Sequence, residues 1–128
     1  MADVTSIMNA DPTGEELVEF AKTKAQLWCK DLKRTQIRNI FTEAREIDAA
    51  WDSSPTKTMR RLNLLKAKLA YQQARNEKSE GLRGLVDVLT KAINEVGKAP
   101  ETQRTEKFRR FMDLFEAILA YHRAFGGN

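Results

Sequence analysis

The sequence has a single cysteine and a single histidine among its 128 residues. One cysteine, Cys29, cannot form an internal disulfide, so nothing indicates an oxidising compartment. A metal site usually needs several His, Cys or carboxylate ligands, and a nucleophile needs a neighbouring base. We interpret Cys29 and His122 as packing residues, since they are far apart in the sequence. We also find no glycine-rich phosphate loop and no HExxH pattern. We therefore predict no catalytic residue, no metal site and no cofactor.

Long apolar runs are also missing. No stretch approaches the roughly 20 apolar residues that a membrane span needs. The first residues, MADVTSIMNADPTGEE, lack the positive and apolar regions of a secretory signal. We expect a cytoplasmic protein with no membrane partner.

Helix breakers are scarce, with three prolines and six glycines. Hydrophobic residues make up 41% and charged residues 31%, which is the balance of a soluble globular domain. Apolar residues recur at helical spacing, and no segment alternates with period two. The sequence predicts an all-α fold: one compact bundle of about five helices over residues 1–128, with residues 1–12 as a flexible segment.

Capping and turn residues delimit these five helices. The first begins with a capping box formed by Thr13 and Glu16. Thr35 caps the second, which ends near the turn at residues 52–55, and the third runs from about Thr56 to Arg75. Ser79 caps the fourth, which ends at Gly97 and Pro100, and the last ends at Gly126 and Gly127.

The apolar positions of these helices predict the core. The first helix is expected to bury Leu17, Phe20, Ala21, Leu27 and Trp28. The later helices are expected to bury Ile37, Ile40, Phe41, Ala44 and Ile47, then Leu62, Leu65 and Leu69, then Leu82, Leu85, Val86, Leu89, Ile93 and Val96, and finally Phe108, Phe111, Met112, Phe115, Ile118, Leu119 and His122.

Charge of one sign is missing from two segments. Residues 1–19 hold five acids and no base, so the rest of the chain carries 22 bases against 13 acids. Residues 53–76 hold six bases and no acid (Lys57, Arg60, Arg61, Lys66, Lys68 and Arg75). Uncompensated positive charges repel one another, and a nearby polyanion would relieve that repulsion.

Helical projection places these bases in two stripes. At about 100° per residue, Lys57, Arg61, Lys68 and Arg75 lie within about 40° of one another and span about 27 Å. Arg34, Arg38 and Arg45 form a second stripe on the preceding helix. Cations at fixed intervals suit a phosphate backbone, and contacts to the backbone do not distinguish one nucleobase from another. The pattern predicts nucleic-acid binding without sequence preference.

The alternative for each base is a surface ion pair. That alternative suits Arg45, which is close in sequence to Glu46 and Asp48, and it suits Arg61 and Lys68 poorly. Tyr71 is expected to pack at a helix interface, with stacking on a base as the alternative.

Other binding modes fit the sequence less well. A helix-turn-helix protein would concentrate the side chains that contact nucleobases at the start of its recognition helix. Here the basic residues run along the whole helix. A membrane-surface helix needs exposed apolar residues that this bundle requires for its core. A protein-interaction bundle, with the acidic N-terminal segment docking a basic partner, stays open.

Three segments resemble the small subunit of the type III-A (Csm) CRISPR effector complex. They are Thr35-Gln36-Ile37-Arg38-Asn39, LNLLKAKLAYQQAR at 62–75, and EKFRRFMDLFEAILAYHRAFGG at 106–127. The likeness covers roughly residues 33–127. Some relatives have proline at the position of Ala67, and many have glycine at that of Ala74.

The resemblance implies a non-nuclease helical bundle, stacked in several copies along the effector. Such subunits line the channel for the guide RNA–target RNA duplex, contact mainly the target strand, and touch the backbone and large subunits. The resemblance assigns an RNA-binding role to Arg38, Lys68 and Arg75, while charge geometry alone adds Lys33, Arg34, Arg61 and Arg83. A type III-B small subunit is the alternative within the same systems.

Overall fold

Apolar side chains at helical spacing account for the helices of this protein. The computed structural model describes residues 3–52 and 55–127. Over those residues it contains six helices and no strand. They are α1 (Val4–Ala10), α2 (Glu15–Trp28), α3 (Arg34–Ala50), α4 (Pro55–Arg75), α5 (Glu80–Lys98) and α6 (Glu101–Ala124). The all-α prediction is confirmed, and the five predicted helices correspond to α2–α6.

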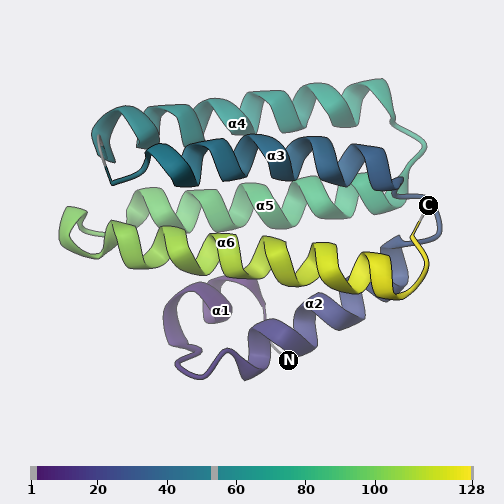
Figure 1. The fold of residues 1–128 in the computed structure, drawn as a ribbon, viewed down its shortest axis with the longest axis horizontal. Coiled ribbons are helices and arrows are strands. Elements are labelled where there is room, and N and C mark those ends of the chain that lie inside the picture. Colours follow the sequence, from purple (N-terminus) through teal and green to yellow (C-terminus); the bar gives the residue numbers. More distant parts are fainter. Residues whose placement is uncertain (1–2, 53–54, 128) are drawn as a thin grey trace.

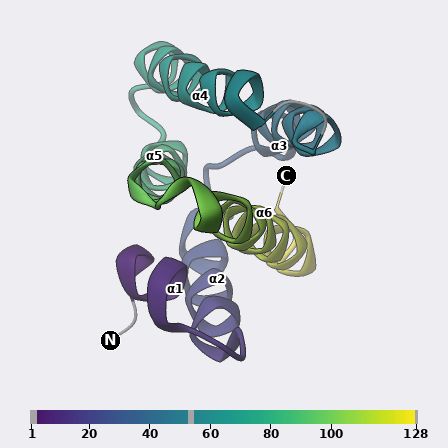
Figure 2. The same cartoon turned by 90° about the vertical axis from the view of Figure 1, so that its left-hand side faces the viewer.

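Helices α3, α4, α5 and α6 lie side by side, and α1 and α2 cover α6 from below (Figure 1). The view from the end of the bundle shows α4 at the edge farthest from α1 and α2 (Figure 2). Helix α4 packs mainly against α3 and α5, whereas α5 and α6 contact several helices each. One side of α4 is therefore open to solvent.

The core is built around α5 and α6. The six predicted apolar positions of α5, from Leu82 to Val96, are all buried. On α6, Phe108 stacks on Trp51 with ring centroids 4.1 Å apart. The Trp51 Nε1–H also donates to Thr105 Oγ1 at 2.9 Å, so the indole is buried with its donor satisfied.

Within residues 1–12, for which the sequence predicted a flexible segment, residues 4–10 form α1. Its three apolar residues, Val4, Ile7 and Met8, are buried. Two cations of α6 bind the last carbonyls of α1: Lys107 Nζ donates to Met8 O at 3.1 Å, and Arg110 donates to Ile7 O at 3.1 Å. A seven-residue helix is unstable alone, so its helicity depends on this packing and was not visible in local sequence.

Two predicted caps and one predicted core residue are wrong. The Asp11 carboxylate caps α2 by accepting from the backbone N–H groups of Glu16 and Leu17, and Thr13 takes no part. At the start of α3, Gln36 Oε1 accepts from the Lys33 backbone N–H at 2.9 Å, in place of a Thr35 cap. Leu27 of α2 is 60% exposed.

The predicted cap at Ser79 is confirmed, and Asp31 reinforces it. Ser79 Oγ accepts from the Leu82 N–H and donates to the Asp31 carbonyl. The Asp31 carboxylate accepts from the backbone N–H groups of Glu80 and Gly81 at 2.9 and 2.8 Å. A Cβ at Gly81 would lie 2.5 Å from Asp31 Oδ1, so glycine permits this approach. Asp31 thus joins the α2–α3 connection to the start of α5.

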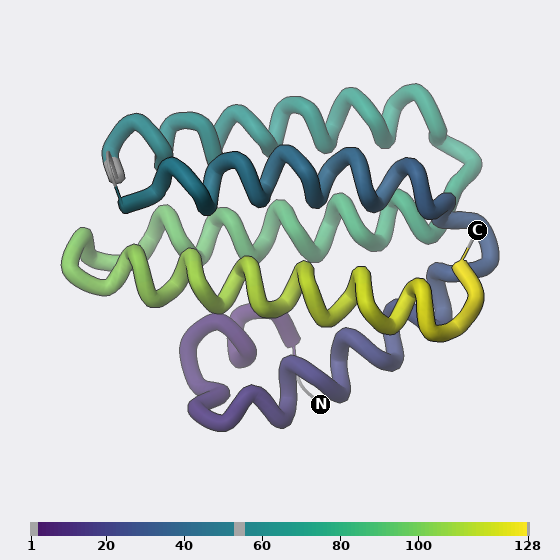
Figure 3. Tube along the Cα trace, viewed as in Figure 1, coloured from purple at the N-terminus to yellow at the C-terminus, as the bar shows by residue number. Residues whose placement is uncertain are grey.

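The last turn of α6 lies at the same end of the bundle as the α2–α3 and α4–α5 connections (Figure 3). His122 belongs to this turn. The His122 ring is fully buried, and its Nε2 lies 2.6 Å from the Leu32 carbonyl oxygen. Gly127 packs against the ring, where a Cβ would clash. Cys29 is half-buried. Both residues therefore have the packing role that the sequence indicated.

Replacement of Asp31 by Ala is expected to lower the free energy of unfolding by about 1–2 kcal/mol, because two N–H groups of α5 lose their acceptor. Urea unfolding followed by circular dichroism measures this change. The matched control is Asp87→Ala on the exposed side of α5, which loses only an ion pair with Lys91. That control is expected to cost at most about 0.5 kcal/mol, and equal losses in the two variants would contradict the capping role.

Candidate nucleic-acid interface

The basic residues of α3 and α4 lie on two neighbouring helices. Helix α4 carries no acid along its 21 residues, and α3 runs beside it over most of its length (Figure 1). Any carboxylate that balances the α4 cations must therefore come from another element. The structure supplies such carboxylates from α3.

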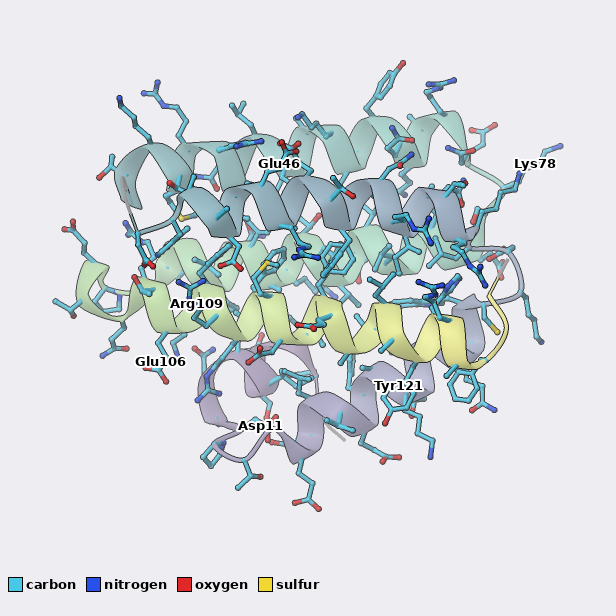
Figure 4. The ribbon with its side chains drawn as sticks, viewed as in Figure 1. Asp11, Glu46, Lys78, Glu106, Arg109 and Tyr121 are labelled. Atoms are coloured by element: carbon cyan, nitrogen blue, oxygen red, sulfur yellow. The ribbon has the colours of Figure 1, made fainter. Side chains whose placement is uncertain are left out.

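Glu43 of α3 pairs with two of the predicted RNA-binding cations. Its Oε1 lies 3.2 Å from Arg61 Nη2 and 3.2 Å from Lys68 Nζ. Arg61 also lies 3.8 Å from Glu46, which Figure 4 shows beside the α3–α4 contact. The prediction that Arg61 and Lys68 have no acidic partner is wrong, because that prediction considered only acids close in sequence.

The Glu43 carboxyl group is held in its charged form. Partial burial raises its pKa, but the hydrogen bond from Lys68 and the positive charges of Lys68 and Arg61 outweigh burial. The net result is a pKa below the ordinary value of 4.5. Glu43 thus brings a full negative charge to the α3–α4 contact at neutral pH.

The outer positions of the α4 stripe are different. Lys57 and Arg75 form no ion pair with any described residue. The Arg75 guanidinium lies over the Tyr71 ring, 5.6 Å from its centroid. Tyr71 is 59% exposed, so the prediction that it packs at a helix interface is wrong within this chain. An exposed aromatic ring with a cation above it is available to a ligand.

The α3 stripe is also unpaired within the part of the chain that the structure describes. Arg34, Arg38 and Arg45 have no carboxylate partner there. The alternative of an ion pair for Arg45 is not observed, because Asp48 pairs with Arg109 of α6 and Glu46 lies 3.8 Å from Arg61. Figure 4 shows Arg109 on the side of α6 that faces α3.

One concavity at the end of the bundle brings further cations together. Lys33, Arg75 and Lys78 line it, together with Gln36 and the acids Asp31 and Glu77. Lys78 was missed because it lies on the α4–α5 connection, outside both helical stripes. The sequence signal for Lys78 was its place on the short connection between the end of α4 at Arg75 and the Ser79 cap of α5.

Arg83 does not join the other predicted RNA-binding residues. It lies on α5, where its Nη2 donates to the Glu77 carbonyl at 2.8 Å. Arg83 lines a separate concavity between α4 and α5, together with Lys66. The seven predicted residues therefore divide into a paired set (Arg61 and Lys68), an unpaired set on or beside α3 and α4 (Lys33, Arg34, Arg38 and Arg75), and Arg83 apart from both.

A groove with a mixed lining lies between the two helices. Thr35, Gln36, Asn39 and Glu43 of α3 line it opposite Lys68 and Gln72 of α4, and its volume is about 230 Å³. Ile40, Leu65 and Leu69 form its apolar part. The amide side chains were missed as binding residues because the predicted sites were chosen by positive charge, which in the Thr35–Asn39 motif singles out Arg38.

No three His, Cys, Asp or Glu side chains of the described residues are grouped so that they could hold a metal ion. None of the helices over residues 3–52 and 55–127 combines the length and apolar character of a membrane span.

The comparisons with known proteins add one finding. A protein-family model described as Csm2 Type III-A matches residues 11–128. Searches of curated proteins and of solved structures gave no match. The matched range includes α2–α6 and both basic stripes.

The charged state of Glu43 predicts a dependence of stability on pH. Because the pKa of Glu43 is lowered on folding, its ion pairs stabilise the protein fully above pH 4.5 and are lost as the pH falls below that value. Glu43→Gln is expected to remove this part of the acid destabilisation, measured as the free energy of unfolding at neutral and at acidic pH. Glu19→Gln, an exposed acid of α2, is the control and is expected to follow the parent protein. An unchanged pH dependence in Glu43→Gln would contradict this role.

Proposed function

Because this chain belongs to the Csm2 Type III-A family of CRISPR effector small subunits, we propose that it binds the guide RNA–target RNA duplex through the phosphate backbone and catalyses no reaction itself. It acts in the cytoplasm as one component of an RNA-guided antiviral complex. Its partners are the two RNA strands, the backbone and large subunits, and neighbouring copies of itself.

The observation that carries the RNA-binding proposal is the set of cations without acidic partners along α3 and α4. Lys33, Arg38, Arg45, Lys57 and Arg75 form no ion pair with the described residues. Their positive charges repel one another in the free subunit, and a row of phosphates would relieve that repulsion while releasing condensed counterions.

The arrangement also accounts for binding without sequence preference. The cations lie along rigid helices, and backbone contacts position a nucleic acid without identifying its bases. A guide–target duplex carries its sequence information in base pairing, so the protein needs only to recognise its shape and backbone. The basic residues are spread along whole helices and are not concentrated at one helix start. This arrangement is consistent with a protein that contacts the backbone while base pairing recognises the sequence.

Exposed apolar side chains support the protein contacts of the proposal. Leu64 and Tyr71 lie two turns apart on the open side of α4, and Val18 and Leu27 lie on α2. Large apolar side chains on a surface mark contact sites when they are grouped. They supply the apolar surface that contact with other subunits requires.

Replacement of Arg38 and Arg75 by Gln tests the RNA contacts. In the assembled complex, the double variant is expected to bind every target RNA more weakly by the same factor. The dependence of log K on log salt should flatten by about 0.7–0.9 for each phosphate that the variant no longer neutralises. Target affinity measured over a range of salt concentrations gives both quantities.

Two control variants sharpen this test. Lys22→Gln removes an exposed cation of α2 and is expected to leave target affinity unchanged. Lys68→Gln is expected to cost less than Arg75→Gln, because Glu43 already neutralises part of the Lys68 charge. If the double variant joins the complex and keeps the parent's affinity and salt dependence, the RNA-binding proposal fails and a protein-interaction role is favoured.

A further inference from the structure

The side of α4 that faces away from the core carries a row of exposed apolar side chains. They recur at intervals of three, four and three residues, and we call them the outer seam: Leu64, Ala67, Tyr71 and Ala74. The two large side chains of the outer seam are more than half exposed, 57% for Leu64 and 59% for Tyr71. Helix α4 packs mainly against α3 and α5 through its other side, at the edge of the bundle (Figure 2). The outer seam is therefore an apolar helix face without a partner among the described residues.

The spacing of the outer seam fits a second helix. Apolar residues three and four apart form a straight row along a helix, and two such rows pack as knobs into holes. Leu64 and Tyr71 alternate with Ala67 and Ala74, so the small residues leave room for the knobs of a facing helix. From Arg60 to Ala74 this face is about 21 Å long at 1.5 Å per residue, which is about four helical turns.

One cation continues the outer seam towards the start of α4. Arg60 lies four residues before Leu64, is exposed, and forms no ion pair with any described residue. A facing helix that covered Arg60 without supplying an acid would leave a desolvated charge unpaired. The matching helix therefore carries Asp or Glu at the level of Arg60, beside its own apolar row.

The outer seam and the basic stripe of α4 lie on different sides of the helix. At about 100° per residue their centres are about 75° apart. The stripe faces α3, since Glu43 of α3 reaches Arg61 and Lys68. The Arg75 guanidinium already lies over the Tyr71 ring, 5.6 Å from its centroid, which leaves that ring less open to a nucleobase. The outer seam thus suits a protein, while the stripe keeps its cations for phosphates.

A second copy of α4 does not supply the missing acid. Residues 53–76 hold six bases and no acid, so two copies of α4 face to face would bring cations together from both sides. Like charges opposed across an interface disfavour the pairing. The charge of α4 therefore selects a helix of different composition.

We propose that the outer seam docks an acidic amphipathic helix from another subunit of the effector complex. This inference rests on the proposed function, because it assumes that the chain works inside a complex of several subunits. Leu64 and Tyr71 are the apolar anchors, and Ala67 and Ala74 allow the partner helix to approach closely. Arg60 pairs with the acid of the partner helix.

A photocrosslinking group beside the outer seam identifies the occupant. Asn63→p-benzoylphenylalanine places this group at an exposed position next to Leu64. After irradiation of the assembled complex without target RNA, mass spectrometry is expected to find it joined to a peptide of a different subunit. That peptide should have apolar residues three and four apart and an Asp or Glu one turn away. A crosslink to RNA, a crosslink to α4 of a second copy, or no crosslink overturns the inference.

The matched control for the crosslink is the same group at Thr23. Thr23 is an exposed residue of α2, on the opposite edge of the bundle from α4 (Figure 2). It is expected not to join the peptide found from position 63. The same peptide from both positions would contradict a docking site on α4.

Truncation of the anchors tests their contribution to docking. The variant that combines Leu64→Ser with Tyr71→Ser is expected to dissociate from the purified complex at roughly 10- to 100-fold higher concentration than the parent. Arg60→Glu is expected to shift dissociation by about 10-fold, because it opposes two acids. Native mass spectrometry over a dilution series gives both shifts. Tyr71→Phe keeps the ring and is expected to dissociate as the parent does.

The outcomes separate this inference from the proposed function. If the double serine variant keeps its fold by circular dichroism and stays in the complex as the parent does, the docking site is overturned. Arg38→Gln, on α3 and outside the outer seam, is expected to stay in the complex and to weaken target RNA binding. If Arg38→Gln leaves target binding unchanged while the serine variant dissociates, the RNA-binding proposal loses support and the docking site stands.

Discussion

The bundle depends on the burial of α5 against its neighbours. Nine residues of this 19-residue helix are buried, and α1, α2, α4 and α6 all contact it. Burial of this area is the main favourable term in folding such a small domain. Because α5 and α6 occupy the centre, the remaining helices each leave a side in solvent, and the charged residues of α3 and α4 gather there.

Glu43 divides the cations on that surface into two kinds. Arg61 and Lys68 help to fasten α4 to α3, while Lys57 and Arg75 of α4 have no such structural task. Arg45 lies apart from them, in the concavity between α3 and α6. Together with Glu46, the same carboxylate makes the centre of the α3–α4 contact nearly neutral and leaves the ends of α4 positive.

The sequence predicted the fold well where apolar periodicity was strong, and poorly where distant residues decide the structure. The stripe from Leu82 to Val96 and the Ser79 cap needed only local information. Helix α1 and the pairing of Glu43 with Arg61 depend on segments brought together by folding. Charge spacing on one helix located the candidate surface, but it could not identify which cations a neighbouring helix would neutralise.

The peripheral place of α4 has a consequence for the motions of the chain. Helix α4 packs mainly against α3 and α5, and one of its sides has no partner within the chain. Segments that are less densely packed open more readily than the core, so the backbone amides of α4 should exchange with solvent faster than those of α5. Any polyanion held by α3 and α4 together would slow that opening, which links occupancy of the surface to the local order of the helix.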